Sequence, residues 1–148
     1  MAAIVSSIEI SRSPEEVFEY AIDPAHLPEW QENVVTAHLQ GTGTPRVGST
    51  IVTTRRLGRR EQPMTMQVTE LEAPSGWALR GVDGPVRAIV RTTIEPVEAG
   101  ASSRVTIELD FEGHGIGKLL VPLLVRPETR RGLPRNLQLL KERVEANA

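Results

Sequence analysis

Apolar and polar residues alternate along most of the chain, which is the period-two pattern of strands with one buried and one exposed face. In the clearest segment, the face expected to be buried carries Val105, Ile107, Leu109 and Phe111. The face expected to be more exposed carries Arg104, Thr106, Glu108 and Asp110. Glycine and proline clusters interrupt the pattern and predict turns. We expect seven strands, near residues 4–10, 32–40, 47–57, 60–72, 76–82, 86–96 and 103–112.

Between the first two strands the sequence predicts two short helices. Ser13 is placed as an N-cap, and Pro14 fits the first helical position, where no backbone donor is needed. Glu16 completes a capping box. The Asp23-Pro24 pair ends this helix, because a residue before proline avoids the α region. Residues 27–30 then predict a second helical turn that carries a large tryptophan side chain.

The pattern becomes helical again near the C-terminus. Apolar residues recur with helical spacing at Leu133, Leu137, Leu140 and Val144. The preceding segment contains four residues that weaken or break a helix, Pro122, Pro127, Gly132 and Pro134. We therefore expect a long helix that is bent or in two pieces, packed against one face of the sheet. This arrangement is a layered α+β domain that spans residues 1–148.

Several segments resemble the polyketide cyclase/dehydrase branch of the START-like (birch-pollen-allergen-like, SRPBCC) superfamily. They are residues 13–18 (SPEEVF), 28–30 (PEW), 68–74 (VTELEAP) and 139–142 (LLKE). The resemblance implies a helix-grip fold. In this fold a seven-stranded curved antiparallel sheet, with two short helices after its first strand, encloses a long, kinked C-terminal helix. It also implies a container for small molecules.

Composition restricts the partners. A chain of 148 residues is long enough for one domain with a core and an internal cavity. Its net charge of -2 argues against nucleic-acid binding, and no cysteine is present for a disulfide or a thiol nucleophile. The sequence has no signal-peptide pattern and no apolar run long enough for a membrane span. We expect a cytoplasmic monomer or homodimer, without stable membrane insertion.

Motifs for catalysis, metals and cofactors are missing. Residues 113–118 lack the glycine spacing and the final Ser/Thr of a phosphate-binding loop, and residues 41–46 fail the dinucleotide fingerprint. The three histidines have no metal-ligand spacing, and no G-x-S-x-G segment exists. We predict no catalytic residue, no metal and no cofactor. The titratable candidates, none of which we expect to be indispensable, are Tyr20, Asp23, His26, His38, Glu70 and His114.

Bulky, adaptable side chains predicted to point inward form the candidate ligand-binding site. They are Trp30, Met64, Met66, Trp77, Leu79, Val90, Thr92, Phe111, Leu120 and Leu124. Thr92 and either Arg55 or Arg56 are the polar contacts expected to orient a ligand. The alternative is that the same side chains fill a solid core. The basic cluster at residues 55–60 is expected at a hairpin tip, where it either protects a strand edge or contacts an anionic partner.

These observations predict binding of a hydrophobic or amphipathic small molecule, lipid-like or polyketide-like, between the sheet and the C-terminal helix. Two alternatives stay open. The resemblance implies a polyketide cyclase or dehydratase, in which polar residues of the same cavity would move protons. The third possibility is a lipid or quinone carrier, in which the apolar residues 119–125 and nearby arginines would contact membranes transiently.

Overall fold

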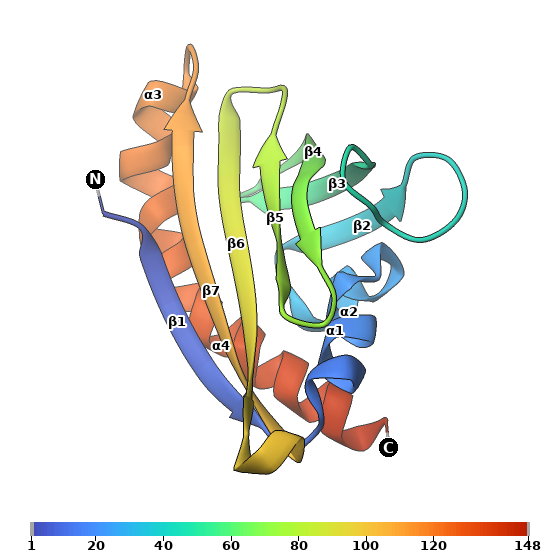
Figure 1. The fold of residues 1–148 in the computed structure, drawn as a ribbon. Helices are drawn as coiled ribbons and strands as arrows, with labels where there is room; N and C mark the ends of the chain where they lie inside the picture. Colours follow the sequence, from blue (N-terminus) through green and yellow to red (C-terminus); the bar gives the residue numbers. More distant parts are fainter. Residues whose placement is uncertain (1, 148) are drawn as a thin grey trace.

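The computed structural model describes residues 2–147. Figure 1 labels the strands β1 to β7 and the helices α1 to α4. The strands are β1 (Ile4–Ile10), β2 (Val34–Leu39), β3 (Thr50–Leu57), β4 (Arg60–Glu72), β5 (Gly76–Gly81), β6 (Val86–Val97) and β7 (Ser102–Gly113). The helices are α1 (Pro14–Ile22), α2 (Leu27–Trp30), α3 (Gly117–Leu120) and α4 (Arg126–Ala146), with a π-helical turn at Val121–Val125 and 3-10 turns at Pro24–His26 and Glu98–Gly100.

The strands form one antiparallel sheet in the order β1-β7-β6-β5-β4-β3-β2. Every strand after β2 is therefore a hairpin neighbour of the strand before it, and β1 closes the far edge beside β7. All seven predicted strands are present, with ends that differ from the prediction by no more than a few residues. The helix-grip fold predicted from the sequence is confirmed, because the long C-terminal helix lies against this curved sheet (Figure 1).

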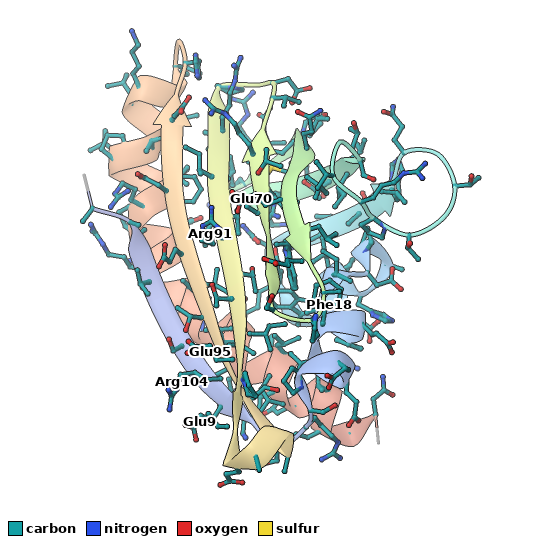
Figure 2. The ribbon with its side chains drawn as sticks, viewed as in Figure 1. Glu9, Phe18, Glu70, Arg91, Glu95 and Arg104 are labelled. Atoms are coloured by element: carbon teal, nitrogen blue, oxygen red, sulfur yellow. The ribbon has the colours of Figure 1, made fainter. Side chains whose placement is uncertain are left out.

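The two faces of the sheet follow the predicted alternation. On β7, Val105 and Ile107 are buried, whereas Arg104 and Glu108 are exposed. Figure 2 shows charged side chains on the outer face. They form cross-strand pairs, with Arg91 2.6 Å from Glu70 and Arg104 2.8 Å from Glu9.

Two residues of β7 depart from the predicted burial. Leu109 and Phe111 lie on the inner face as expected, yet both are only partly buried. The reason is a space inside the sheet that both residues line. The alternation therefore predicts the face on which a side chain lies, but not whether other atoms fill the space in front of it.

The helices α1 and α2 close one end of the inner face. The backbone N–H of Glu16 donates to the Ser13 hydroxyl at 3.3 Å, so the predicted N-cap of α1 is confirmed. Phe18 on α1 meets Trp77 on β5 edge to face, with ring centroids 5.5 Å apart. Trp30 at the end of α2 is buried, as expected for an anchor.

The C-terminal helix follows the predicted apolar stripe. The side chains that it buries in the core are Leu133, Leu137, Leu140 and Val144. Figure 1 shows the helix running beside β7 and β1 and then turning towards α1 and α2. The irregularity is the π-helical turn Val121–Val125, which contains Pro122.

The breaks expected at Gly132 and Pro134 are absent, because α4 is continuous from Arg126 to Ala146. Pro127 follows the π-helical turn directly, in a backbone that stays helical from Gly117 to Ala146, so its missing N–H removes one helical hydrogen bond there. Pro134 removes one hydrogen bond to the carbonyl of Arg130. Because Arg130 is exposed, water can hydrate that carbonyl, so the helix continues through Pro134.

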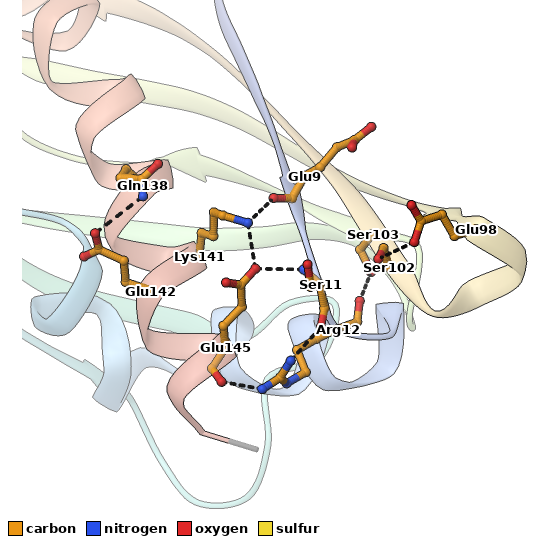
Figure 3. Close-up of polar contacts among 10 residues, drawn as sticks. All are labelled: Glu9, Ser11, Arg12, Glu98, Ser102, Ser103, Gln138, Lys141, Glu142 and Glu145. Carbon is orange, nitrogen blue, oxygen red and sulfur yellow. Dashed lines mark hydrogen bonds and ion pairs between the residues drawn. The ribbon is translucent and has the colours of Figure 1, made fainter.

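A polar network fixes the end of α4 to the end of β1 (Figure 3). Lys141 Nζ lies 2.7 Å from Glu145 Oε2 and donates to the carbonyl of Glu9 at 3.0 Å. The backbone N–H of Ser11 donates to the same Glu145 carboxylate at 2.9 Å. The helix is therefore held at its end by hydrogen bonds in addition to its apolar contacts.

Candidate ligand-binding cavity

A cavity of about 330 Å³ lies between the inner face of the sheet and α4. Its walls are mainly apolar side chains from five strands and from the helical segments. Those on the strands are Ile51, Leu57, Met64, Trp77, Leu79, Val86, Ala88, Val90, Ile107, Leu109 and Phe111. Those on the helical segments are Ala21, Ile22, Leu27, Trp30, Val125 and Leu133. A volume of this size accommodates a small organic molecule.

Most of the predicted ligand-binding residues lie in these walls. The ones that line the cavity are Trp30, Met64, Trp77, Leu79, Val90, Thr92 and Phe111. Met66, Leu120 and Leu124, which the sequence analysis places in the same space, are not among the residues that line it. The sheet therefore supplies most of the predicted lining, whereas of residues 117–125 only Val125 borders the cavity.

Each of these three residues packs elsewhere. Met66 follows Met64 on the inner face of β4 but is enclosed by Ile51, Val68 and Ala88. Leu120 packs beside Met64 in a separate cluster with Val86, Val121 and Val125. The Leu124 side chain lies beside Gly58 in the turn between β3 and β4.

Thr92 is a polar group in the apolar part of the wall. Its side chain is buried on the inner face of β6, and it forms no side-chain hydrogen bond with residues 2–147. Its hydroxyl is not among the buried side-chain atoms of residues 2–147 that lack a hydrogen-bond partner, so it is accessible from the cavity. Thr92 is thus free to bond to a molecule in the cavity.

Arg55 is the second polar residue of the wall. It shares the inner face of β3 with Ile51 and Leu57, so its guanidinium is directed to the cavity side of the sheet. Its Nη1 donates to Gln31 Oε1 at 3.0 Å and to Asn33 Oδ1 at 3.5 Å. Burial lowers the pKa of Arg55 to about 10, so the side chain remains a cation at neutral pH.

The neighbouring Arg56 does not belong to the cavity. It is exposed on the opposite face of β3 and lies 3.8 Å from Glu61. The sequence leaves the two arginines as alternatives. Because side chains alternate along a strand, Arg55 lies on the cavity face of β3 and Arg56 on the opposite face. Arg59 and Arg60 are exposed at the predicted hairpin tip.

The mouth of the cavity lies between α4 and the segment that joins α2 to β2. Residues 31–33 form one side, and the polar residues Glu128, Thr129, Arg131, Arg135 and Asn136 form the other. Glu32 bridges the two sides. Its carboxylate lies 3.5 Å from Arg135 Nη2, and its backbone N–H donates to Asn136 Oδ1 at 3.2 Å.

The titratable candidates of the sequence analysis all lie outside the cavity walls. The Tyr20 hydroxyl donates to Glu29 at 3.0 Å, and burial together with this carboxylate raises the pKa of Tyr20 to about 12. The His26 ring stacks on Tyr20, with centroids 4.1 Å apart. Asp23 accepts a hydrogen bond from the backbone N–H of Ala25, which caps the 3-10 turn. These residues stabilise the junction of α1 and α2.

The other three candidates lie on the outside of the sheet. Glu70 pairs with Arg91, His38 is exposed on β2, and His114 lies 3.6 Å from Glu112. Within residues 2–147, no group of three or more His, Cys, Asp or Glu side chains is placed to hold a metal ion.

Sequence reasoning missed the polar mouth. The mouth residues Glu128, Arg131 and Arg135 lie three and four positions apart on α4, which is the spacing of one helix face beside the buried stripe. That spacing was available as a signal. No such signal exists for residues 31–33, because their position depends on how α2 ends and directs the chain towards β2.

The sequence matches the family described as "Polyketide cyclase / dehydrase and lipid transport" over residues 1–145. The chain belongs to this family. Among curated proteins, no sequence gives a significant match.

Solved structures agree with this family in fold. A crystal structure of a Thermus thermophilus protein has a TM-score of 0.80 at 18% identity and covers 99% of both chains. A START superfamily protein from Mycobacterium smegmatis has a TM-score of 0.78 at 17% identity and covers 100% of both. The Zhui aromatase/cyclase from Streptomyces sp. R1128 has a TM-score of 0.77 at 11% identity, over 97% of this chain and 93% of that one. Identities this low establish the shared fold alone.

Proposed function

We propose that this family member binds a hydrophobic or amphipathic small molecule in the cavity between the sheet and α4. The observation that carries the proposal is a mainly apolar space of about 330 Å³ inside the domain. A few polar groups, among them Thr92 and Arg55, would orient the ligand. Trp30 and Trp77 both line the space, so a bound molecule would change tryptophan fluorescence.

Filling the cavity tests this function. Val90→Phe adds a ring to a partly buried position in the cavity wall, whereas Ile89→Phe makes a similar change at an exposed position on the other face of β6. The assay is tryptophan quenching by an amphipathic probe such as 1-anilinonaphthalene-8-sulfonate. We expect Val90→Phe to weaken probe binding at least tenfold and Ile89→Phe to leave it within twofold. Equal binding by both folded variants would refute the proposal.

The composition of the walls favours binding over proton transfer. The ionisable residues that line the cavity are Glu32, Arg55, Glu128, Arg131 and Arg135. A cyclase or dehydratase needs an acid or base beside the reacting atoms, most often a histidine, a carboxylate or a tyrosine. Here both carboxylates belong to the mouth. Turnover of a polyketide-like substrate that disappears in Glu128→Gln, with binding retained, would instead support the enzymatic alternative.

A second candidate, ligand transfer at a membrane surface, is favoured by a separate observation. Ile116, Leu119 and Leu123 are 59%, 64% and 75% exposed. Their spacing places them on one side of the segment that begins with α3, next to the cation of Lys118. Within residues 2–147, no helix is long and apolar enough to cross a membrane. A shallow contact with anionic lipid would cover these side chains.

Vesicle sedimentation tests the membrane contact. We expect the protein to sediment with vesicles that contain phosphatidylglycerol and less with pure phosphatidylcholine vesicles. The double variant Leu119→Glu/Leu123→Glu should lose this association. Val47→Glu, at an equally exposed apolar position outside the segment, is the control. Loss in both variants, or in neither, would count against transfer at membranes.

A further inference from the structure

Arg55 carries a positive charge inside the cavity wall without a counter-ion. Among residues 2–147, no carboxylate oxygen lies within 4.0 Å of its guanidinium nitrogens, which is the limit for an ion pair. Its partners are the neutral amide oxygens of Gln31 and Asn33. By contrast Arg126, which is buried outside the cavity walls, lies 3.0 Å from Asp110. A partly buried cation without a compensating charge is unfavourable, so its presence here requires an explanation.

Arg55 also stands where the strand pattern calls for an apolar residue. The inner face of β3 presents Ile51, Thr53, Arg55 and Leu57 in succession. The Thr53 hydroxyl is satisfied, because it donates to the carbonyl of Met64 at 3.0 Å. The guanidinium has five N–H donors, and its side-chain bonds use only Nη1. The remaining donors have no side-chain partner among the described residues.

The two amides beside Arg55 extend this set of donors. An arginine only donates, so Gln31 and Asn33 must turn their oxygens towards it. Their NH₂ groups are then directed away from the guanidinium, and neither makes a hydrogen bond to a side chain or backbone of residues 2–147. Both amides line the cavity. The result is a group of hydrogen-bond donors that lacks an acceptor.

The charges of the cavity do not balance. Its ionisable side chains are Arg55, Arg131, Arg135, Glu32 and Glu128, which sum to one positive charge. Glu32 is already paired with Arg135 across the mouth. Within the part of the chain that the structure describes, Glu128 forms no ion pair with either remaining arginine. A single negative charge on a ligand would bring the sum to zero.

We propose that the ligand is an amphipathic carboxylic acid whose carboxylate binds to Arg55, Gln31 and Asn33 while its apolar part lies against Trp77, Leu79 and Val90. The inference rests on the proposed binding function and adds the chemical class of the ligand. A carboxylate has only acceptors and matches the planar donors of a guanidinium. The head group would lie beside the mouth, because residues 31–33 form one side of it.

Three probes with the same alkyl chain test the head group: decanoic acid, 1-decanol and decylamine, each titrated at pH 7.5 while the change in tryptophan emission is recorded. For the wild-type protein we expect the acid to bind at least about tenfold more tightly than the alcohol, and the amine no better than the alcohol. In Arg55→Met the acid should lose this preference, while the alcohol binds within about threefold of wild type, because the apolar cavity remains.

The controls separate Arg55 from other cations and from misfolding. Arg56→Met removes the adjacent exposed arginine and should keep the acid preference. Arg55→Gln is a second variant should Arg55→Met fold poorly. Preference for the acid in folded Arg55→Met or Arg55→Gln, or its absence in wild type while the alcohol binds, would overturn the inference. Failure of all three probes would instead count against the binding function itself.

Discussion

Arg135 on α4 lies 3.5 Å from Glu32 in the segment between α2 and β2, so an ion pair spans the mouth of the cavity. The same residue, Glu32, is attached to α4 a second time through its backbone N–H and Asn136. A molecule that enters between these elements must pass beside both contacts. We therefore expect the Glu32 segment to control access to the interior.

Glu32→Gln removes the ion pair and keeps the backbone contact. Both charged side chains are largely exposed, so we expect the free energy of unfolding to change by less than about 0.5 kcal/mol. Association and dissociation rates of a quenching probe should both rise in stopped-flow experiments, because the opening is easier to widen. Arg143→Gln, which removes an exposed pair with Glu29 outside the lining, is the control. Unchanged rates in Glu32→Gln would show that ligands enter elsewhere.

Leu140 tests whether the helix is gripped. It is fully buried among the residues that join α4 to the sheet. Leu140→Ala should lower the free energy of unfolding by about 2 to 4 kcal/mol, because it leaves a cavity in the core. Leu123→Ala, at a 75% exposed position, should change it by less than about 0.5 kcal/mol. Urea denaturation followed by circular dichroism measures both, and a small effect at Leu140 would mean that α4 is not docked.

Most of the fold could be predicted from local patterns. The Ser13 cap needs only residues 13 to 16, and the faces of β6 and β7 need only the alternation of side chains. Leu133 and Leu140 follow from helical spacing. The continuity of α4 through Pro134 could not be predicted in this way, because it depends on the exposure of a carbonyl one turn earlier.

The residues that line the cavity could be predicted only in part, because they too depend on contacts between distant segments. The face of a strand follows from the sequence, so Met64, Trp77 and Val90 were placed on the inner side. Whether an inner residue lines a space or fills one depends on what α4 brings opposite it. Met66 and Phe111 illustrate the two outcomes, since the first is enclosed and the second borders the cavity.

Arg126 is an example of a stabilising contact without a local signal. It is 3% exposed, lies 3.0 Å from Asp110 on β7 and donates to the carbonyl of Ala2 at 2.6 Å. Arg126→Met should destabilise the protein by about 1 to 2 kcal/mol, a limited cost because the partly exposed Asp110 can be hydrated. Arg130→Met, one turn later and exposed, should be close to neutral. Thermal unfolding of both variants measures the difference.

Glu145 predicts a dependence of stability on pH. The Lys141 ammonium, and then the backbone N–H of Ser11, hold the pKa of the Glu145 carboxyl below its ordinary value of 4.5. The folded protein therefore binds this proton less readily than the unfolded chain does. The resulting stabilisation is present above about pH 4.5 and is lost as the pH falls through the lower pKa of the folded state.

Glu145→Gln isolates this contribution. The difference in the free energy of unfolding between wild type and Glu145→Gln should be largest near pH 7 and should shrink below pH 4.5, where the wild-type carboxylate becomes protonated. Glu142→Gln is the matched control on the same helix, because Glu142 only accepts a 3.4 Å hydrogen bond from Gln138 at the surface. Urea denaturation at pH 3 to 7 measures both differences. If the wild-type advantage over Glu145→Gln were constant across this range, the carboxylate charge would contribute nothing to the attachment of α4 to β1.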